Sequence, residues 1–125
     1  MDKLDAIFTM QAALDEEIIA RRNLQHIEPQ EWIQKEVLAL IDELSEVLNE
    51  VNYKWWKTPK QIDETALKEE LVDVLHFFVS MCLKAGMTSR ELHDIYMEKN
   101  KENFDRQRGL SNKPGYAVSE EFIQP

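Results

Sequence analysis

An apolar stretch near the middle of the chain decides the fold. It reads Leu71-Val72-Asp73-Val74-Leu75-His76-Phe77-Phe78 and continues to Leu83. On a helix its apolar residues lie on nearly every side, a pattern typical of a buried helix. The stretch predicts a central helix over about 64–85, with Gly86 placed to cap its end. It is interrupted by polar residues and is too short to cross a bilayer, so we expect no membrane association.

Three further helices are expected around this central one, over about 3–22, 29–53 and 89–106. The second begins at the Glu28-Pro29 pair, because proline suits the first position of a helix. It carries an apolar stripe at helical spacing, which we interpret as its inward face: Ile33, Val37, Ile41, Leu44, Leu48 and Val51. In the fourth helix Thr88 and Glu91 form a capping-box pattern.

These elements predict an all-α protein built as a four-helix bundle. The helical catalytic domain is expected over residues 1–108, and residues 109–125 are interpreted as a tail without a core of its own. A central helix that is apolar on all sides favours further burial between chains. We therefore expect a homo-oligomer, either a dimer or a dimer of dimers.

Composition narrows the functional classes. The 125 residues carry 24 acidic and 15 basic side chains, a formal net charge of −9. A surface of that sign repels phosphate backbones, which argues against nucleic-acid binding. A divalent metal would still allow such a protein to bind a polyphosphate. The single Cys82 and the absence of a signal-peptide pattern after Met1 favour a cytoplasmic location.

Two acidic pairs are the main candidates for chemistry. Glu43 and Glu46 lie three residues apart on the second helix, and Glu70 and Asp73 repeat that spacing on the central helix. The first pair alone would usually be solvated surface charge. The second lies within apolar sequence, where an uncompensated carboxylate is costly. Together they favour a metal site, and all-oxygen ligands select Mg²⁺, with Mn²⁺ as a substitute.

The spacing of these pairs resembles a known signature. Glu43-x-x-Glu46, 23 residues, then Glu70-x-x-Asp73 is similar to the all-α pyrophosphohydrolase superfamily, which includes MazG and the dimeric dUTPases. Four further segments of this chain resemble the dUTPase branch: Met10-Gln11-x-x-Leu14, Tyr53-Lys54-Trp55-Trp56-Lys57, Val72-Asp73-x-x-His76-Phe77 and Lys99-Asn100-x-x-Asn103-x-x-Arg106-Gln107. Two features depart from the family pattern. Asp15 stands where the family usually has Asn, and Gly115-Tyr116 is displaced along the chain.

The resemblance implies Mg²⁺-dependent hydrolysis of dUTP to dUMP and pyrophosphate. It implies that Glu43, Glu46, Glu70 and Asp73 are both metal ligands and catalytic residues, with Glu43 as general base. It also implies that Gln11 contacts the uracil edge and that Phe77 packs on the deoxyribose. The remaining substrate-binding residues implied are Trp56, Lys57, His76, Lys99, Asn103 and Arg106.

Several alternatives stay open at this point. The inward amide of Gln11 could be a structural hydrogen-bonding group, His76 a core residue, and the Lys99–Arg106 stripe simply a helix face entering solvent. The substrate could be dCTP or a modified nucleotide rather than dUTP. A helical interaction module whose carboxylates are only surface charge is a rival from another class.

Overall fold

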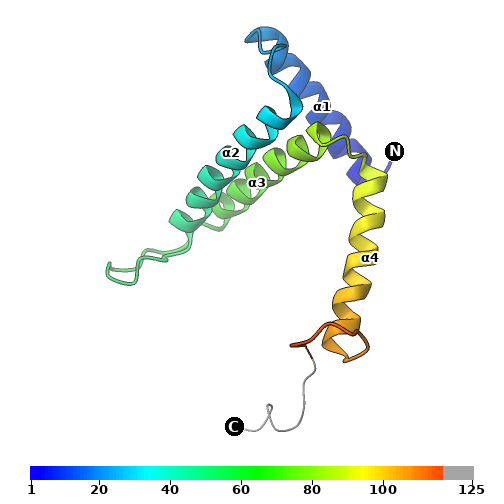
Figure 1. Ribbon diagram of the computed structural model, residues 1–125. Coiled ribbons are helices and arrows are strands. Elements are labelled where there is room, and N and C mark those ends of the chain that lie inside the picture. The colour runs from blue at the N-terminus through cyan, green and yellow to red at the C-terminus, as the bar shows by residue number, and fades with distance from the viewer. Residues whose placement is uncertain (117–125) are drawn as a thin grey trace. The chain divides into compact units, whose positions relative to one another are not determined.

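The computed structural model describes residues 1–116, which form four α-helices: α1 (Lys3–Arg21), α2 (Pro29–Glu50), α3 (Glu64–Lys84) and α4 (Ser89–Gln107). No strand occurs among these residues, so the predicted all-α class is confirmed. The chain divides into two compact units, Met1–Thr88 and Ser89–Pro125. Helices α1, α2 and α3 belong to the first unit and α4 to the second (Figure 1).

Local sequence explains where the helices of the first unit begin and end. The Asp2 and Asp63 side chains accept hydrogen bonds from backbone N–H groups in the first turns of α1 and α3. Helix α2 begins at Pro29, as predicted. Gly86 ends α3 with φ of +81°, and the Met87 N–H donates back to the Cys82 carbonyl at 2.9 Å. This is the hydrogen-bond pattern of a glycine-terminated helix.

Helix α3 holds the first unit together. Helices α2 and α3 form an antiparallel pair joined by residues 51–63, and α1 also packs on α3 (Figure 1). The buried apolar side chains in the described residues are Phe8, Val79 and Cys82, of which Val79 is fully buried. They lie on α1 and on the C-terminal half of α3. The expectation that α3 is central to its neighbours is met.

Of the inward stripe predicted for α2, Ile33 is half-buried in the single chain, and the other five residues are exposed. Val37, Ile41, Leu44, Leu48 and Val51 are 36–56% exposed. From Glu36 onward a different line of α2 is better shielded, with carboxylates at every seventh residue: Glu36 is buried, and Leu40, Glu43, Val47 and Glu50 are half-buried. Both lines have helical spacing, so periodicity alone could not decide which one faces α3.

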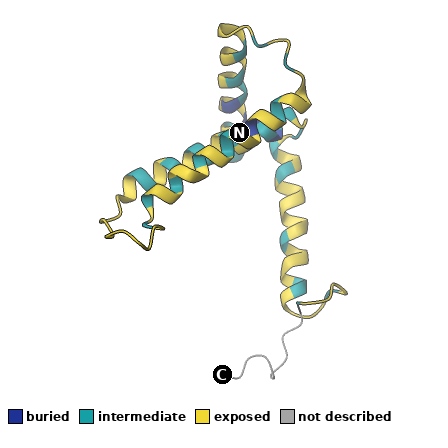
Figure 2. Cartoon of the chain, turned by 60° about the vertical axis from the view of Figure 1, so that its left-hand side comes forward, coloured by how far each residue is buried: buried dark blue, intermediate teal, exposed yellow. Residues whose placement is uncertain are grey.

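Helix α3 is likewise only partly covered in one chain. Leu71 and Val72 are about half exposed, at 51% and 53%, and Leu75 and Phe78 are both 39% exposed. Exposed residues (yellow) and half-buried residues (teal) alternate along the α2–α3 pair in Figure 2. Apolar surface this extensive is unusual on a protein that stays monomeric.

In the second unit, α4 is stabilised by contacts one turn apart. Lys101 pairs with Asp105 at 2.9 Å and Arg106 with Glu102 at 3.2 Å. The guanidinium of Arg108 lies 4.7 Å from the Phe104 ring centre. No described residue of α4 is buried within the chain. The predicted division at residue 108 stays a prediction, and most of the predicted tail, residues 117–125, lies outside the described part.

Among residues 1–116, no single helix is long and apolar enough to span a bilayer. Only α3 and α4 together, as a pair broken between them, meet the requirement on length and composition.

The exposed apolar faces of α2 and α3 predict self-association. Ile41, 56% exposed on α2, should be covered by a second copy, so Ile41→Lys should move the protein toward the monomer by placing a charge in an apolar interface. Sedimentation velocity should give the unmodified chain a mass that is a multiple of 14.8 kDa. Gln25→Lys, which adds the same charge at an exposed polar position in the turn between α1 and α2, should leave that mass unchanged. A monomeric unmodified chain would refute the expectation.

Candidate metal centre and nucleotide cavity

Three carboxylates from two helices converge in the first unit. Glu43 on α2 and Glu70 and Asp73 on α3 each offer an oxygen, and these oxygens all lie within 4.8 Å of one another. Glu46, the fourth predicted ligand, lies outside this group and is exposed. The structure therefore brings together three of the four predicted ligands. The assignment of Glu46 stays a prediction.

The electrostatics of the group disfavour full ionisation of its carboxylates. Partial desolvation, followed by the charge of Asp73, raises the pKa of Glu43 above its usual value, although a hydrogen bond with Glu70 opposes the shift. Desolvation and then Asp73 likewise raise the pKa of Glu70. Glu46 contributes to both shifts through its charge. Crowded oxygens of this kind fit a hard divalent cation such as Mg²⁺.

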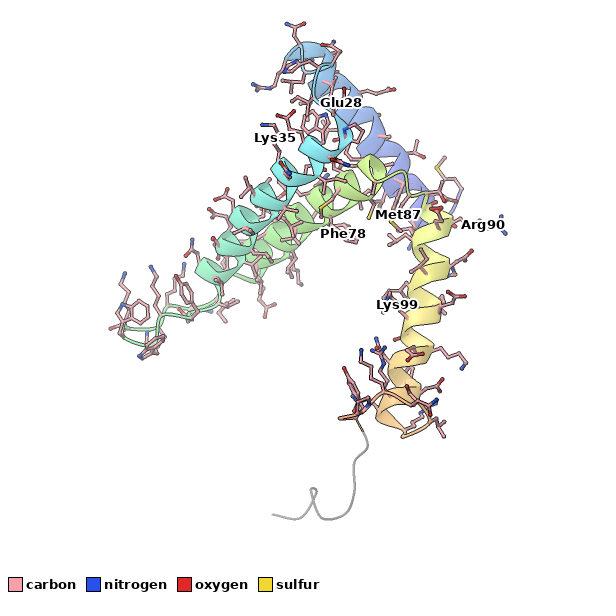
Figure 3. All side chains as sticks on the ribbon, in the orientation of Figure 1. Glu28, Lys35, Phe78, Met87, Arg90 and Lys99 are labelled. Carbon is pink, nitrogen blue, oxygen red and sulfur yellow. The ribbon has the colours of Figure 1, made fainter. Side chains whose placement is uncertain are left out.

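A cavity of about 600 Å³ lies beside the carboxylates. Glu43 and Asp73 line it, so part of the acidic group faces its interior. Gln11, His76 and Phe77, three of the predicted nucleoside contacts, line the same cavity. Lys35 also lines it and extends from the first half of α2 (Figure 3). All three helices of the first unit thus contribute to one site.

Gln11 is buried, at 7% exposure, and bridges α1 to α3. Its Nε2 donates to Asp15 Oδ1 at 3.0 Å, and its Oε1 lies 2.7 Å from His76 Nδ1. Because a carboxylate only accepts, the amide nitrogen must face Asp15 and the amide oxygen must face the histidine. His76 therefore donates from Nδ1 to the Gln11 amide oxygen.

Four polar residues of the cavity were not predicted from the sequence: Lys35, Glu36, Ser80 and Lys84. The Ser80 hydroxyl contacts both Asp15 and Glu36, and Lys84 Nζ lies 3.2 Å from Asp15 Oδ2 and 3.5 Å from Glu36 Oε1. Lys84 also lies 4.9 Å from the Trp32 ring centre. The sequence did contain a signal for two of them. Glu36 lies seven residues before Glu43, and Ser80 lies seven residues after Asp73. Residues two helical turns apart lie on the same face.

The aromatic segment after α2 forms a separate cavity. Trp56 and Lys57, two of the predicted substrate contacts, line a cavity of about 700 Å³ together with Tyr53 and Asn52. The Trp55 and Trp56 rings meet edge to face with their centres 4.6 Å apart, and Trp55 is 86% exposed. Asn52 closes the segment by donating to the Lys60 carbonyl and accepting from its N–H. Neither Trp56 nor Lys57 lines the cavity that contains Gln11.

Comparison with known proteins decides the family. The sequence profile of a family described as dUTPase matches residues 3–91, which include the acidic group and the cavity on α1, α2 and α3. The chain belongs to this dUTPase family. The match contains both acidic pairs of the predicted signature and ends at Glu91, the third residue of α4.

Curated relatives of this dUTPase-family chain include viral enzymes. It is 36% identical over 87 residues to a dCTP pyrophosphatase of Enterobacteria phage T4. The aligned residues make up 58% of this chain and 51% of the relative. It is 42% identical over 45 residues to the dCTP pyrophosphatase of Enterobacteria phage LZ5, covering 36% and 26%. A DNA replication protein of phage T4 is 33% identical over 81 residues, covering 54% and 21%. The chain thus spans about half of the first relative and less of the others. No solved structure gives a significant match.

The predicted phosphate contacts belong to the second unit. Lys99 and Asn103 are exposed on α4, and Arg106 is half-buried. Arg106 is held within the helix by Glu102 at 3.2 Å and Asn103 at 3.5 Å, and its guanidinium lies 5.5 Å from the Tyr116 ring centre. The binding of phosphate by these residues stays a prediction.

The crowded carboxylates predict opposite effects on metal binding and on stability. Ionisation of groups whose pKa is raised in the folded state destabilises the fold above about pH 4.5. Asp73→Asn should therefore raise the melting temperature of the metal-free protein at pH 7, because it relieves Glu43 and Glu70. The same change should weaken Mg²⁺ binding at least tenfold by removing a ligand. Melting in a chelator and titration calorimetry measure the two effects.

Glu69→Gln provides the control, because it removes a charge from an exposed residue of α3 outside the group. It should leave Mg²⁺ affinity unchanged. Equal Mg²⁺ affinity in Asp73→Asn and the unmodified chain would show that Asp73 is not a ligand.

Proposed function

We propose that this protein is a metal-dependent pyrophosphohydrolase that converts a pyrimidine deoxynucleoside triphosphate to its monophosphate and pyrophosphate. One observation carries the proposal. The Glu43, Glu70 and Asp73 oxygens lie within 4.8 Å of one another, and two of these residues line the cavity that also contains Gln11, His76 and Phe77. Family membership supports the same activity.

A metal site next to a cavity suits a nucleoside triphosphate, because the metal would bind the phosphates and the cavity would bind the nucleoside. Glu43, Glu70 and Asp73 would hold Mg²⁺, with Glu46 as the fourth ligand and Mn²⁺ as a substitute ion. When bound, the ion would supply neutralisation of the phosphate charge and a lowered pKa of attacking water. The raised pKa of Glu43 suits a group that takes up a proton, which supports the proposal that it is the general base. No covalent nucleophile is required.

The cavity would hold the nucleoside. The half-buried Phe77 offers an apolar surface for the deoxyribose, and His76 offers the Nε2 of its ring. Lys35 adds a positive charge on the α2 side. Lys99, Asn103 and Arg106 on α4 would bind phosphate oxygens, for which the planar guanidinium of Arg106 is well suited. Trp56 and Lys57 would cover bound substrate or a second chain.

Two bases are candidates. The family description favours dUTP, the substrate predicted from sequence, and the names of the two phage relatives favour dCTP. A homodimer in the cytoplasm, acting on free nucleotides, agrees with the exposed apolar faces and the negative charge. The exposed faces are also where a helical interaction module would bind a partner, but such a module would need no cluster of carboxylates at a cavity.

The activity has a direct test. The purified full chain should release pyrophosphate from dUTP or dCTP in the presence of Mg²⁺, and a chelator should abolish the release. dTTP and UTP complete the panel, because rejection of UTP would show discrimination against the 2′-hydroxyl. Asp73→Asn should lose the activity while it stays folded by circular dichroism. Absence of pyrophosphate release from every nucleotide would reject the enzyme and leave the interaction module.

The phosphate role of α4 has a separate test. Arg106→Ala should weaken binding of the triphosphate by about 1.5–3 kcal/mol, the range for hydrogen bonds to charged groups. Binding of the corresponding nucleoside should change much less, because it has no phosphate. Arg90→Ala, which removes the same charge from an exposed residue at the start of α4, is the control. Equal losses for triphosphate and nucleoside would place Arg106 away from the phosphates.

A further inference from the structure

The wall of the Gln11 cavity contains a cluster of polar groups that the metal chemistry does not use. It is contributed by α1, α2 and α3 and consists of Asp15, Glu36, Ser80 and Lys84. Glu36 and Ser80 are buried, at 6% and 2% exposure, and the side chains of Asp15 and Lys84 are 14% and 15% exposed. Polar groups so well shielded from water need partners inside the protein or in a ligand.

The hydrogen bonds within the cluster leave one acceptor without a donor. The Ser80 hydroxyl contacts Asp15 Oδ2 at 2.7 Å and also Glu36 Oε1, but its single proton can serve only one of them. Lys84 Nζ contacts Asp15, Glu36 and Ser80 at 3.2–3.5 Å. Glu36 Oε2 is buried and has no hydrogen-bond partner. An unsatisfied buried oxygen of this kind destabilises the empty protein.

The charges of the cluster point to the same kind of ligand. Asp15 and Glu36 bring two carboxylates and Lys84 brings one ammonium, so acceptors exceed donors. Gln11 does not remove the imbalance, because it is uncharged and one of its two amide hydrogens already serves Asp15 while its Oε1 faces His76. A ligand edge that donates hydrogen bonds would complete the cluster, whereas an edge that presents a carbonyl oxygen would meet a carboxylate.

We infer that Glu36, supported by Asp15, selects a pyrimidine with an exocyclic amino group, so that cytosine is bound in preference to uracil. The inference rests on the proposed function and deepens it. Cytosine carries an N4 amino donor where uracil carries the O4 acceptor. The amino group would donate to the Glu36 carboxylate, which lines the cavity and has one oxygen without a partner, and the Lys84 ammonium would keep both carboxylates in place.

A structural role for the cluster is the simplest rival. Asp15, Ser80, Glu36 and Lys84 do tie α1, α2 and α3 together, and such a tie alone would explain the ion pairs. It would not explain why Glu36, a residue that lines the cavity, holds the buried side-chain oxygen that has no partner within residues 1–116. The two interpretations differ in whether Glu36 affects base preference.

The test compares kcat/KM for dCTP and dUTP in the full chain with Mg²⁺. The unmodified protein should favour dCTP by about tenfold or more, as expected for one hydrogen bond to a charged group. Glu36→Gln keeps the shape but presents an amide that can also donate, so it should reduce the dCTP/dUTP ratio by about tenfold. Glu16→Gln, the same change at an exposed residue of α1 outside the cavity, should leave the ratio unchanged.

Equal or greater activity on dUTP in the unmodified chain would overturn the inference. An unchanged ratio in a folded Glu36→Gln variant would also overturn it and would favour the purely structural role. Should Glu36→Gln fail to fold, Asp15→Asn makes the corresponding change on α1. It should shift the ratio in the same direction, and an unchanged ratio there would count against the inference.

Calorimetry with dCMP and dUMP separates this inference from the proposed function. These monophosphates need no hydrolysis, so they report the base preference of the cavity even when no triphosphate is cleaved. Tighter binding of dCMP would support the role of Glu36 although the enzyme proposal had failed. Equal binding of the two, together with normal pyrophosphate release, would overturn the inference and leave the enzyme proposal intact.

Discussion

Repulsion among the carboxylates of Glu43, Glu70 and Asp73 is the constraint on which the rest of the first unit depends. Helices α2 and α3 pack along their length, and that packing places three oxygens within 4.8 Å of one another. Desolvation and this proximity raise the pKa of Glu43 and of Glu70. The apolar contacts of the helix pair therefore hold in place an arrangement that is electrostatically unfavourable until a cation binds.

Helix α1 completes the cavity beside the acidic group. It contributes little apolar burial beyond Phe8, but its Gln11 and Asp15 reach α3 through His76, Ser80 and Lys84. These contacts form a cavity wall whose hydrogen-bonding groups are fixed in direction, because a carboxylate only accepts and an ammonium only donates. A preorganised wall of this type can distinguish base edges, which a metal site alone cannot do.

The packing within one chain also explains why the protein has exposed apolar surface. The exposed apolar residues of α2 and α3 are part of the same helices that present the carboxylates on another face. A helix that is apolar around most of its circumference can be covered only from several sides, and α1 and α2 cover some of them. This leaves apolar surface for which a second copy of the chain is the expected cover.

Local sequence determined the helices and the pairing of acidic residues within each helix. Pro29, Asp63 and Gly86 set helix ends through interactions a few residues long, and the three-residue spacing of Glu70 and Asp73 places them on one face wherever the helix packs. Which faces meet was decided only by tertiary structure, because α2 carries two lines of residues with the same period. In the folded chain the line that contains Glu36 and Glu43 faces α3. Glu46 therefore lies outside the acidic group, and Glu36 lies beside Ser80. Periodicity is a property of one helix, whereas a site made by three helices depends on contacts far apart in the sequence.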